Sequence, residues 1–135
     1  MPTREDAVLL RVFVGERERH DHRPVYEAIV HAARDAGLAG ASALRGMMGY
    51  GHGRRIETAK ILDLSDNLPV VVEIVDTEEK IEAFLPTLDA MMGSGLVTIE
   101  KVKVLHYGRT GPGLPRISLR DMIETQVGGE TSSGG

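Results

Sequence analysis

The stretch Ala41–Thr58, ASALRGMMGYGHGRRIET, decides how the rest of the chain is organised. It begins as an apolar, strand-like segment, passes through three glycines spaced by two residues, and ends in two arginines. A second strand-like run, Thr58–Leu64, follows directly. Two such runs around a glycine-rich centre predict a β-hairpin with a basic tip. The residues of this tip are Gly49, Tyr50, Gly51, His52, Gly53, Arg54 and Arg55.

The chemistry of the tip suits an anionic ligand such as a phosphate group. Glycine residues leave backbone amide groups open, and two guanidinium groups and an imidazole stand beside them. The alternative is a mobile hairpin tip whose charges are simply solvated. Residue types alone favour this alternative, so the anion site is a hypothesis that needs further support.

Length and composition narrow the classes of protein to which the chain can belong. Its 135 residues are enough for one domain with a single core. Aromatic residues make up only 4%, so the core must be built mainly from aliphatic side chains. The net charge of -4 argues against broad binding of nucleic acid, which requires a basic surface. The absence of cysteine excludes disulfides, thiolate metal sites and cysteine nucleophiles.

The sequence also contains no pattern typical of a membrane or secreted protein. No apolar run approaches the roughly 20 residues that span a bilayer. The polar segment Met1–Asp6 lacks the apolar centre of a signal peptide. We therefore expect a cytoplasmic protein without direct membrane insertion.

The segment before the hairpin predicts a strand followed by a helix. Ala7–Val14 is a nearly continuous apolar run, typical of a central strand, and Gly15–Arg23 is a polar loop. Pro24 suits the first position of a helix, and Gly37 suits its end. Apolar residues recur at helical spacing between them, at Tyr26, Ile29, Val30 and Ala33.

The segment after the hairpin repeats this pattern. Pro69–Val75 predicts a buried strand, and Asp76 with Glu79 three residues later predicts the capping box of a second helix. Val97–Tyr107 is the last predicted strand, and its charged residues suit the edge of a sheet. The apolar stripe of the second helix comprises Ile81, Phe84, Leu85, Leu88, Met91 and Met92, and Gly93 and Gly95 end the helix.

The resulting order, β-α-β-β-α-β, predicts an α+β fold of the ferredoxin-like type, with both helices on one face of an antiparallel sheet. We place this domain at residues 7–108. The composition changes at Gly108, and residues 109–135 are expected to form a flexible extension in which Ser118–Ile123 starts a short helix. Two strands are apolar on both faces although the helices cover only one, which predicts a homo-oligomer that buries the other face.

Several sequence blocks together resemble the PII-like proteins known as domain of unknown function 190. The resemblance extends from about Val8 to Tyr107, roughly three quarters of the chain. The blocks that carry it are Leu10–Glu16, Pro24–Val30, Ala36–Ala41, Leu44–Gly51, Thr58–Leu62 and Leu68–Asp76.

The resemblance implies a trimer that binds nucleotides such as ATP or ADP in clefts between subunits. It also implies that the hairpin loop reports the bound state to a transporter, a channel or an enzyme. Gly49-Tyr50-Gly51 is similar to the Gly-Phe-Gly that opens this loop in PII proteins. The chain departs from them at Met92–Leu96, which replaces their glycine-rich, lysine-ending phosphate loop.

Three residues outside the tip complete the set of candidate ligand-binding residues. Arg45 lies in an apolar strand segment, so it should either form a structural ion pair or reach a cleft between subunits. His106 and Arg109 lie near the end of the last strand, where PII proteins bring residues of a neighbouring subunit to the nucleotide. Together with the tip, these residues define the predicted site for a small anion, with an adenine nucleotide as the effector that the resemblance implies.

Alternative functions have less support in the sequence. His20 and His22, with Asp21 and Glu18, could hold a divalent metal, as in a trimer related to the divalent-cation tolerance proteins. A scaffold without a ligand is a third reading. The chain lacks the Gly-x-Ser-x-Gly and His-Glu-x-x-His motifs of hydrolases, so we do not expect an enzyme.

Overall fold

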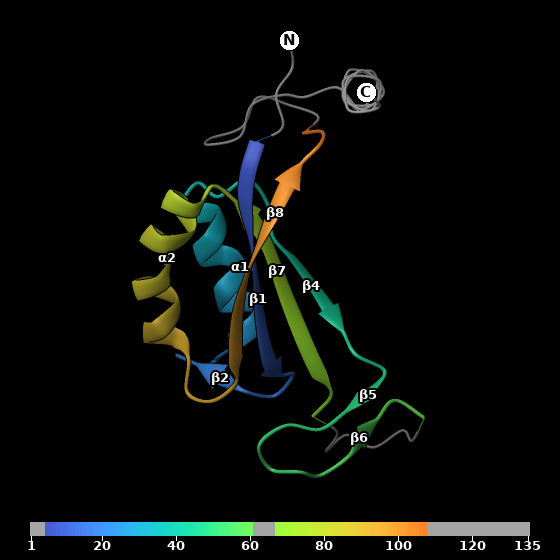
Figure 1. Ribbon diagram of the computed structural model, residues 1–135. Coiled ribbons are helices and arrows are strands. Elements are labelled where there is room, and N and C mark those ends of the chain that lie inside the picture. The colour runs from blue at the N-terminus through green and yellow to red at the C-terminus, as the bar shows by residue number, and fades with distance from the viewer. Residues whose placement is uncertain (1–4, 61–66, 108–135) are drawn as a thin grey trace, which may run out of the picture.

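The structure of the protein is a computed structural model, and the residues that it describes are 5–60 and 67–107. A four-stranded antiparallel sheet carries two helices on one face (Figure 1). The sheet order is β4-β7-β1-β8, which confirms the predicted ferredoxin-like arrangement. Its elements are β1 (Glu5–Gly15), α1 (Val25–Asp35), β4 (Ser42–Arg45), β7 (Pro69–Asp76), α2 (Glu78–Met91) and β8 (Leu96–Val104); the short strands are β2 (Arg19–His20), β3 (Arg23–Pro24), β5 (Met48–Gly49) and β6 (Glu57–Thr58).

The core lies between the two helices and the two central strands. Side chains alternate along β1 and β7, so every second residue points toward the helices and is buried. Each fully buried aliphatic side chain of this kind contributes roughly 1.5–3 kcal/mol relative to exposure. The fully buried side chains of the core include Leu10, Val12, Val72 and Ile74 from the sheet and Ile29 and Ile81 from the helices.

The end of α1 agrees with the predicted position of Gly37, whereas its start differs slightly from the prediction. Gly37 has a φ of +76°, and its N–H and that of Leu38 donate to the carbonyls of Arg34 and Ala33, which is a Schellman motif. Pro24 is the cap residue rather than the first helical residue, because it still pairs with Arg19 in the β2–β3 hairpin. The loop predicted at Gly15–Arg23 contains this small hairpin.

The predicted capping box of α2 is wrong by one residue. Asp76 still pairs with Val8 and is fully buried at the end of β7, so it cannot begin the helix. Thr77 is the cap, and its Oγ1 accepts a hydrogen bond from the Lys80 N–H at 3.3 Å. The Asp76 carboxylate instead accepts from the Thr77 N–H at 2.7 Å and from the Ala39 N–H at 2.9 Å, and so joins β7 to the α1–β4 loop.

The predicted hairpin forms, but its ladder is much shorter than the sequence suggested. β5 pairs with β6 through only Met48 with Thr58 and Gly49 with Glu57. The first part of the predicted first arm, β4, pairs with β7 instead, because the valines of β7 offer a partner inside the main sheet. Of the predicted run Thr58–Leu64, residues 61–64 lie outside the described residues, as do the extension 109–135 and its expected short helix.

The sheet face opposite the helices is only partly covered within one chain. Its residues on β1 and β7 are half-buried, and most are apolar, as expected. The centre, however, is ionic: Arg11 Nε lies 2.8 Å from Glu73 Oε2, and Arg11 Nη1 lies 3.3 Å from Glu100 Oε2. The hydrogen bond to Glu73 raises the pKa of Arg11 above its ordinary value. The open face therefore carries its own counter-ions. At the end of β1, on the side of the sheet that carries the helices, a hydrogen bond from Lys103 lowers the pKa of the exposed Asp6.

Neither of the two described helices is long and apolar enough to cross a membrane.

Candidate functional site

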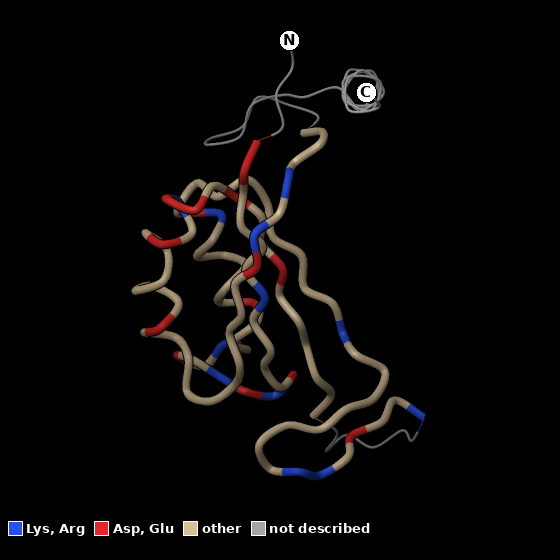
Figure 2. Tube along the Cα trace, viewed as in Figure 1, with Lys and Arg blue, Asp and Glu red and all other residues tan. Residues whose placement is uncertain are grey.

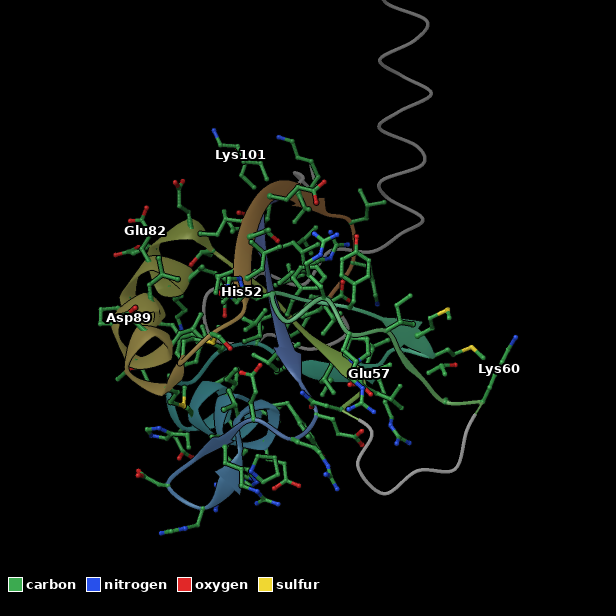
Figure 3. The ribbon with its side chains drawn as sticks, turned by 90° about the horizontal axis from the view of Figure 1, so that it is seen from below. His52, Glu57, Lys60, Glu82, Asp89 and Lys101 are labelled. Carbon is green, nitrogen blue, oxygen red and sulfur yellow. The ribbon has the colours of Figure 1, made fainter. Side chains whose placement is uncertain are left out.

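The predicted hairpin tip forms one wall of a cleft with a volume of about 690 Å³. The other walls are the end of β1 with the turn after it, the start of β7, and the turn between α2 and β8. Figure 1 shows the β5–β6 loop curving beneath this end of the sheet. Seen from below in Figure 3, His52 lies over the end of the sheet, whereas Lys60 points away from the body. The cleft therefore joins four separate segments of the sequence.

All seven predicted residues of the tip line this cleft, and together they give it a cationic side. Arg54 and Arg55 are both exposed, and Figure 2 shows them as a blue segment well separated from the acidic residues of α2. The lining of the same cleft also includes the apolar residues Phe13, Tyr50 and Leu96. A cleft lined by both cationic and apolar side chains can hold a ligand that has an anionic group and a flat ring.

The backbone of the tip turns at a residue that sequence reasoning did not single out for that role. Arg54 has a φ of 62°, and its N–H donates to the carbonyl of Gly51 at 2.9 Å. Gly51 and Gly53 do not have a positive φ, and a Cβ atom added to either would meet nothing within 4 Å. The glycine that the fold requires here is Gly49, because a Cβ atom there would lie 3.0 Å from Cγ of Pro69.

Four polar residues of the cleft were missed by sequence reasoning: Glu18, Glu57, Asn67 and Ser94. Glu57 Oε1 lies 3.5 Å from Arg55 Nε, and Glu57 Oε2 accepts the Asn67 N–H at 3.3 Å. Glu18 Oε1 accepts the Gly15 N–H at 3.1 Å and the Ser94 hydroxyl at 3.3 Å. The only signal in the sequence was the spacing of Arg55 and Glu57, since two residues apart on a strand places side chains on the same side.

The remaining candidate residues do not line this cleft in a single chain. Arg45 forms an ion pair with Glu16, in which Arg45 Nε lies 3.1 Å from Glu16 Oε1. A structural ion pair was one of the two roles predicted for Arg45. His106 lies at a second concavity of about 760 Å³ on the open face, near Tyr107, whose hydroxyl donates to the Ala39 carbonyl at 3.0 Å. Arg109 lies outside the described residues.

The structure gives little support to the metal-binding alternative. Among residues 5–60 and 67–107, no group of three or more histidine, aspartate or glutamate side chains could hold a metal ion. His20 and His22 belong to the β2–β3 hairpin, and His20 Nε2 lies 3.3 Å from Oδ2 of the neighbouring Asp21. Asp21 and His22 both have positive φ, as a tight two-residue hairpin requires.

Comparison with solved structures shows that the fold is that of the PII-like proteins. CPII, a nitrogen regulatory PII-like protein from Thiomonas intermedia K12 solved with ADP, AMP and bicarbonate, superposes with a TM-score of 0.54 at 17% identity. The match covers 77% of this chain and 92% of CPII. A PII-like signaling protein from Thermus thermophilus gives a TM-score of 0.55 at 16% identity over 73% of this chain and 89% of its own.

The chain belongs to the family of domain of unknown function 190, described as "Uncharacterized ACR", whose model matches residues 7–104. A UPF0166 protein of Aquifex aeolicus is 41% identical over 98 residues, which cover 73% of this chain and 92% of the relative. A UPF0166 protein of Methanocaldococcus jannaschii is 34% identical over 94 residues, covering 69% and 86%. The resemblance found in the sequence is therefore confirmed.

Proposed function

We propose that this protein is a PII-like regulator that binds a small anionic effector in the cleft between the hairpin tip and the end of the sheet. An adenine nucleotide is the first candidate for this effector. The observation that carries this proposal is the composition of the cleft, whose lining combines the exposed Arg54 and Arg55 with Phe13, Tyr50 and Leu96. Guanidinium groups recognise phosphate through paired hydrogen bonds, and apolar rings can pack against a purine base.

Two further points support a nucleotide as the ligand. CPII, which has the same fold, was solved with ADP and AMP. The cleft volume of about 690 Å³ lies within the range of roughly 300–1,000 Å³ that is typical of small-molecule sites. The turn at Met92–Leu96 contains no lysine, so we assign the positive charge that faces the phosphates to the arginines of the tip, which line the cleft.

The proposal includes assembly as a homotrimer in which the open sheet faces are covered by neighbouring copies. Such an assembly would bury apolar residues of this face such as Leu44, which is half-exposed in the single chain, and single chains rarely expose large contiguous apolar patches. It would also allow His106 and Arg45 of neighbouring copies to approach a cleft. The hairpin tip, whose position depends on the ligand, would then control a transporter, a channel or an enzyme.

We expect the full-length chain to sediment as a single species with three times the mass of one protomer. The physical reason is the uncovered apolar surface of the sheet, whose burial favours association. Analytical ultracentrifugation or light scattering at micromolar concentration measures this directly. A stable monomer under these conditions would contradict both the assembly and any binding site that needs a neighbouring copy.

Replacing both tip arginines, Arg54→Ala and Arg55→Ala, should weaken ADP binding by about tenfold or more while the protein stays folded. A charge-assisted hydrogen bond to a guanidinium is worth roughly 1.5–3 kcal/mol, which corresponds to this loss when it is removed. Isothermal titration calorimetry with ADP measures the effect, and sedimentation checks that the assembly is intact.

The matched control for the tip variant is Arg19→Ala with Arg34→Ala, which removes the same charge from exposed positions outside the cleft. This control should bind ADP nearly as well as the wild type. Equal binding by the wild type, the tip variant and the control would exclude the hairpin tip from the site. Absence of binding even to the wild type would exclude ADP as the effector.

A further inference from the structure

Arg55 is held by a carboxylate that belongs to the same hairpin. Its Nε lies 3.5 Å from Oε1 of Glu57, and both side chains line the cleft. The two partners differ in exposure: 68% of the Arg55 side chain is exposed, but only 13% of that of Glu57. The contact is long and its guanidinium is mostly solvated, so the ion pair is weak and an anion that binds the guanidinium better can replace the carboxylate.

Glu57 is anchored to the body of the domain by a second contact. Its Oε2 accepts the N–H of Asn67, and Asn67 Oδ1 accepts the N–H of Arg17 at 2.7 Å. The Asn67 side chain packs so closely on Gly15 that a Cβ atom there would lie 2.6 Å from Asn67 Nδ2. The carboxylate is therefore fixed to the end of β1, whereas the guanidinium reaches out from the tip.

Arg54, the neighbouring cation, is in a different state. No carboxylate of the described residues lies within ion-pair distance of the Arg54 guanidinium, although Arg54 lines the same cleft. The tip thus presents one guanidinium without a counter-ion and one that is already engaged. An anion that enters the cleft can approach Arg54 directly, but it has to compete with Glu57 for Arg55.

We infer that Glu57 is an internal competitor for the ligand: it holds Arg55, and with it the hairpin tip, while the cleft is empty, and it gives Arg55 up when an anion binds. This inference rests on the proposed function, because it concerns the regulation of the same site. Glu57 is bound to Asn67, so loss of the Arg55–Glu57 contact frees the Arg55 side chain of the tip from the body of the domain. Ligand binding would therefore change the position of the tip.

The inference is tested by a double-mutant cycle on the full-length chain with ADP as the probe. Glu57→Gln removes the charge but keeps an oxygen that can accept the Asn67 N–H, so the fold should survive, which thermal melting checks. We expect Glu57→Gln to tighten ADP binding about two- to fivefold, the effect of removing one exposed competing ion pair. In an Arg55→Gln background the same change should have little effect, because Glu57 then has no guanidinium to withhold.

Glu18→Gln is the matched control, since Glu18 also lines the cleft but its carboxylate contacts Gly15 and Ser94 rather than an arginine. A general effect of negative charge would make Glu18→Gln act like Glu57→Gln, and equally in both backgrounds. That outcome would contradict the proposed competition between Glu57 and the ligand, but it would not contradict the proposed nucleotide site. If neither the wild type nor any variant binds ADP, both the proposed nucleotide function and the proposed competition are contradicted.

A spin label on the tip tests the tether without any ligand. The chain has no cysteine, and Gly53 has open space around it, so Gly53→Cys provides one labelling position. We expect Glu57→Gln to increase the mobility of this label in the empty protein, while Glu18→Gln leaves it unchanged. Equal spectra for the wild type and Glu57→Gln would show that Glu57 does not hold the tip.

Discussion

Gly95→Ala is expected to destabilise the protein by about 3 kcal/mol or more, from backbone strain and overpacking together. Gly95 has a φ of +124°, a conformation that residues with a side chain rarely adopt. A Cβ atom there would lie 2.4 Å from the carbonyl oxygen of Phe13, which belongs to the central strand and cannot move aside easily. Urea unfolding at one fixed protomer concentration measures the loss, because the stability of an oligomer depends on concentration.

Gly37→Ala separates the two causes of this loss. Gly37 also has a positive φ, +76°, but nothing lies within 4 Å of the position of its Cβ atom. We therefore expect this variant to lose only about 1 kcal/mol, from backbone strain alone. Losses of equal size in the two variants would show that the close approach of Gly95 to β1 contributes nothing.

Asp76→Ala should also cost about 3 kcal/mol, because it removes the buried acceptor of two partly buried hydrogen bonds. The carboxylate is fully buried and accepts from the N–H groups of Ala39 and Thr77. Each hydrogen bond to a charged group is worth roughly 1.5–3 kcal/mol, and an unsatisfied buried N–H adds to the loss. The α1–β4 loop, which Asp76 holds, should lose protection against hydrogen exchange.

Thr77→Ala is the control for the role of Asp76, since Thr77 is the actual cap of α2. Loss of a cap costs roughly 1 kcal/mol, so this variant should be clearly more stable than Asp76→Ala in the same urea series. The reverse order would mean that the two hydrogen bonds of the Asp76 carboxylate stabilise the protein less than the helix cap at Thr77 does.

The sequence was sufficient for the order of the main elements because their signals are local. The apolar run at Ala7–Val14 and the helical stripe from Ile81 to Met91 each specify one element without knowledge of the rest. The boundary at Asp76 was misplaced because aspartate and threonine both cap helices well. Only the pairing of Asp76 with Val8 decides between them.

Only part of the candidate site could be predicted, because only the residues of the tip are consecutive in the sequence. The glycines and arginines of the tip are consecutive, so their chemistry is visible in one stretch of sequence. Glu18, Asn67 and Ser94 come from three other segments, and they meet the tip only because the strands end at the same side of the sheet. Glu57 was missed because a carboxylate two residues from an arginine is an ordinary surface pattern until its burial is known.

The pairing of β1 with β8 also limits how early the sheet can be completed while the chain is being synthesised. Glu5 lies opposite Val104, so the central strand stays open on one side until nearly the whole domain has left the ribosome. Contacts between such distant parts of a chain form slowly, and an unpaired strand edge invites aggregation in the meantime. Since Ser94–Leu96 completes the cleft at the start of β8, an effector that binds there can recognise only chains whose synthesis has passed that point. A ligand bound in this cleft would then favour newly made chains that have finished folding over those that have not.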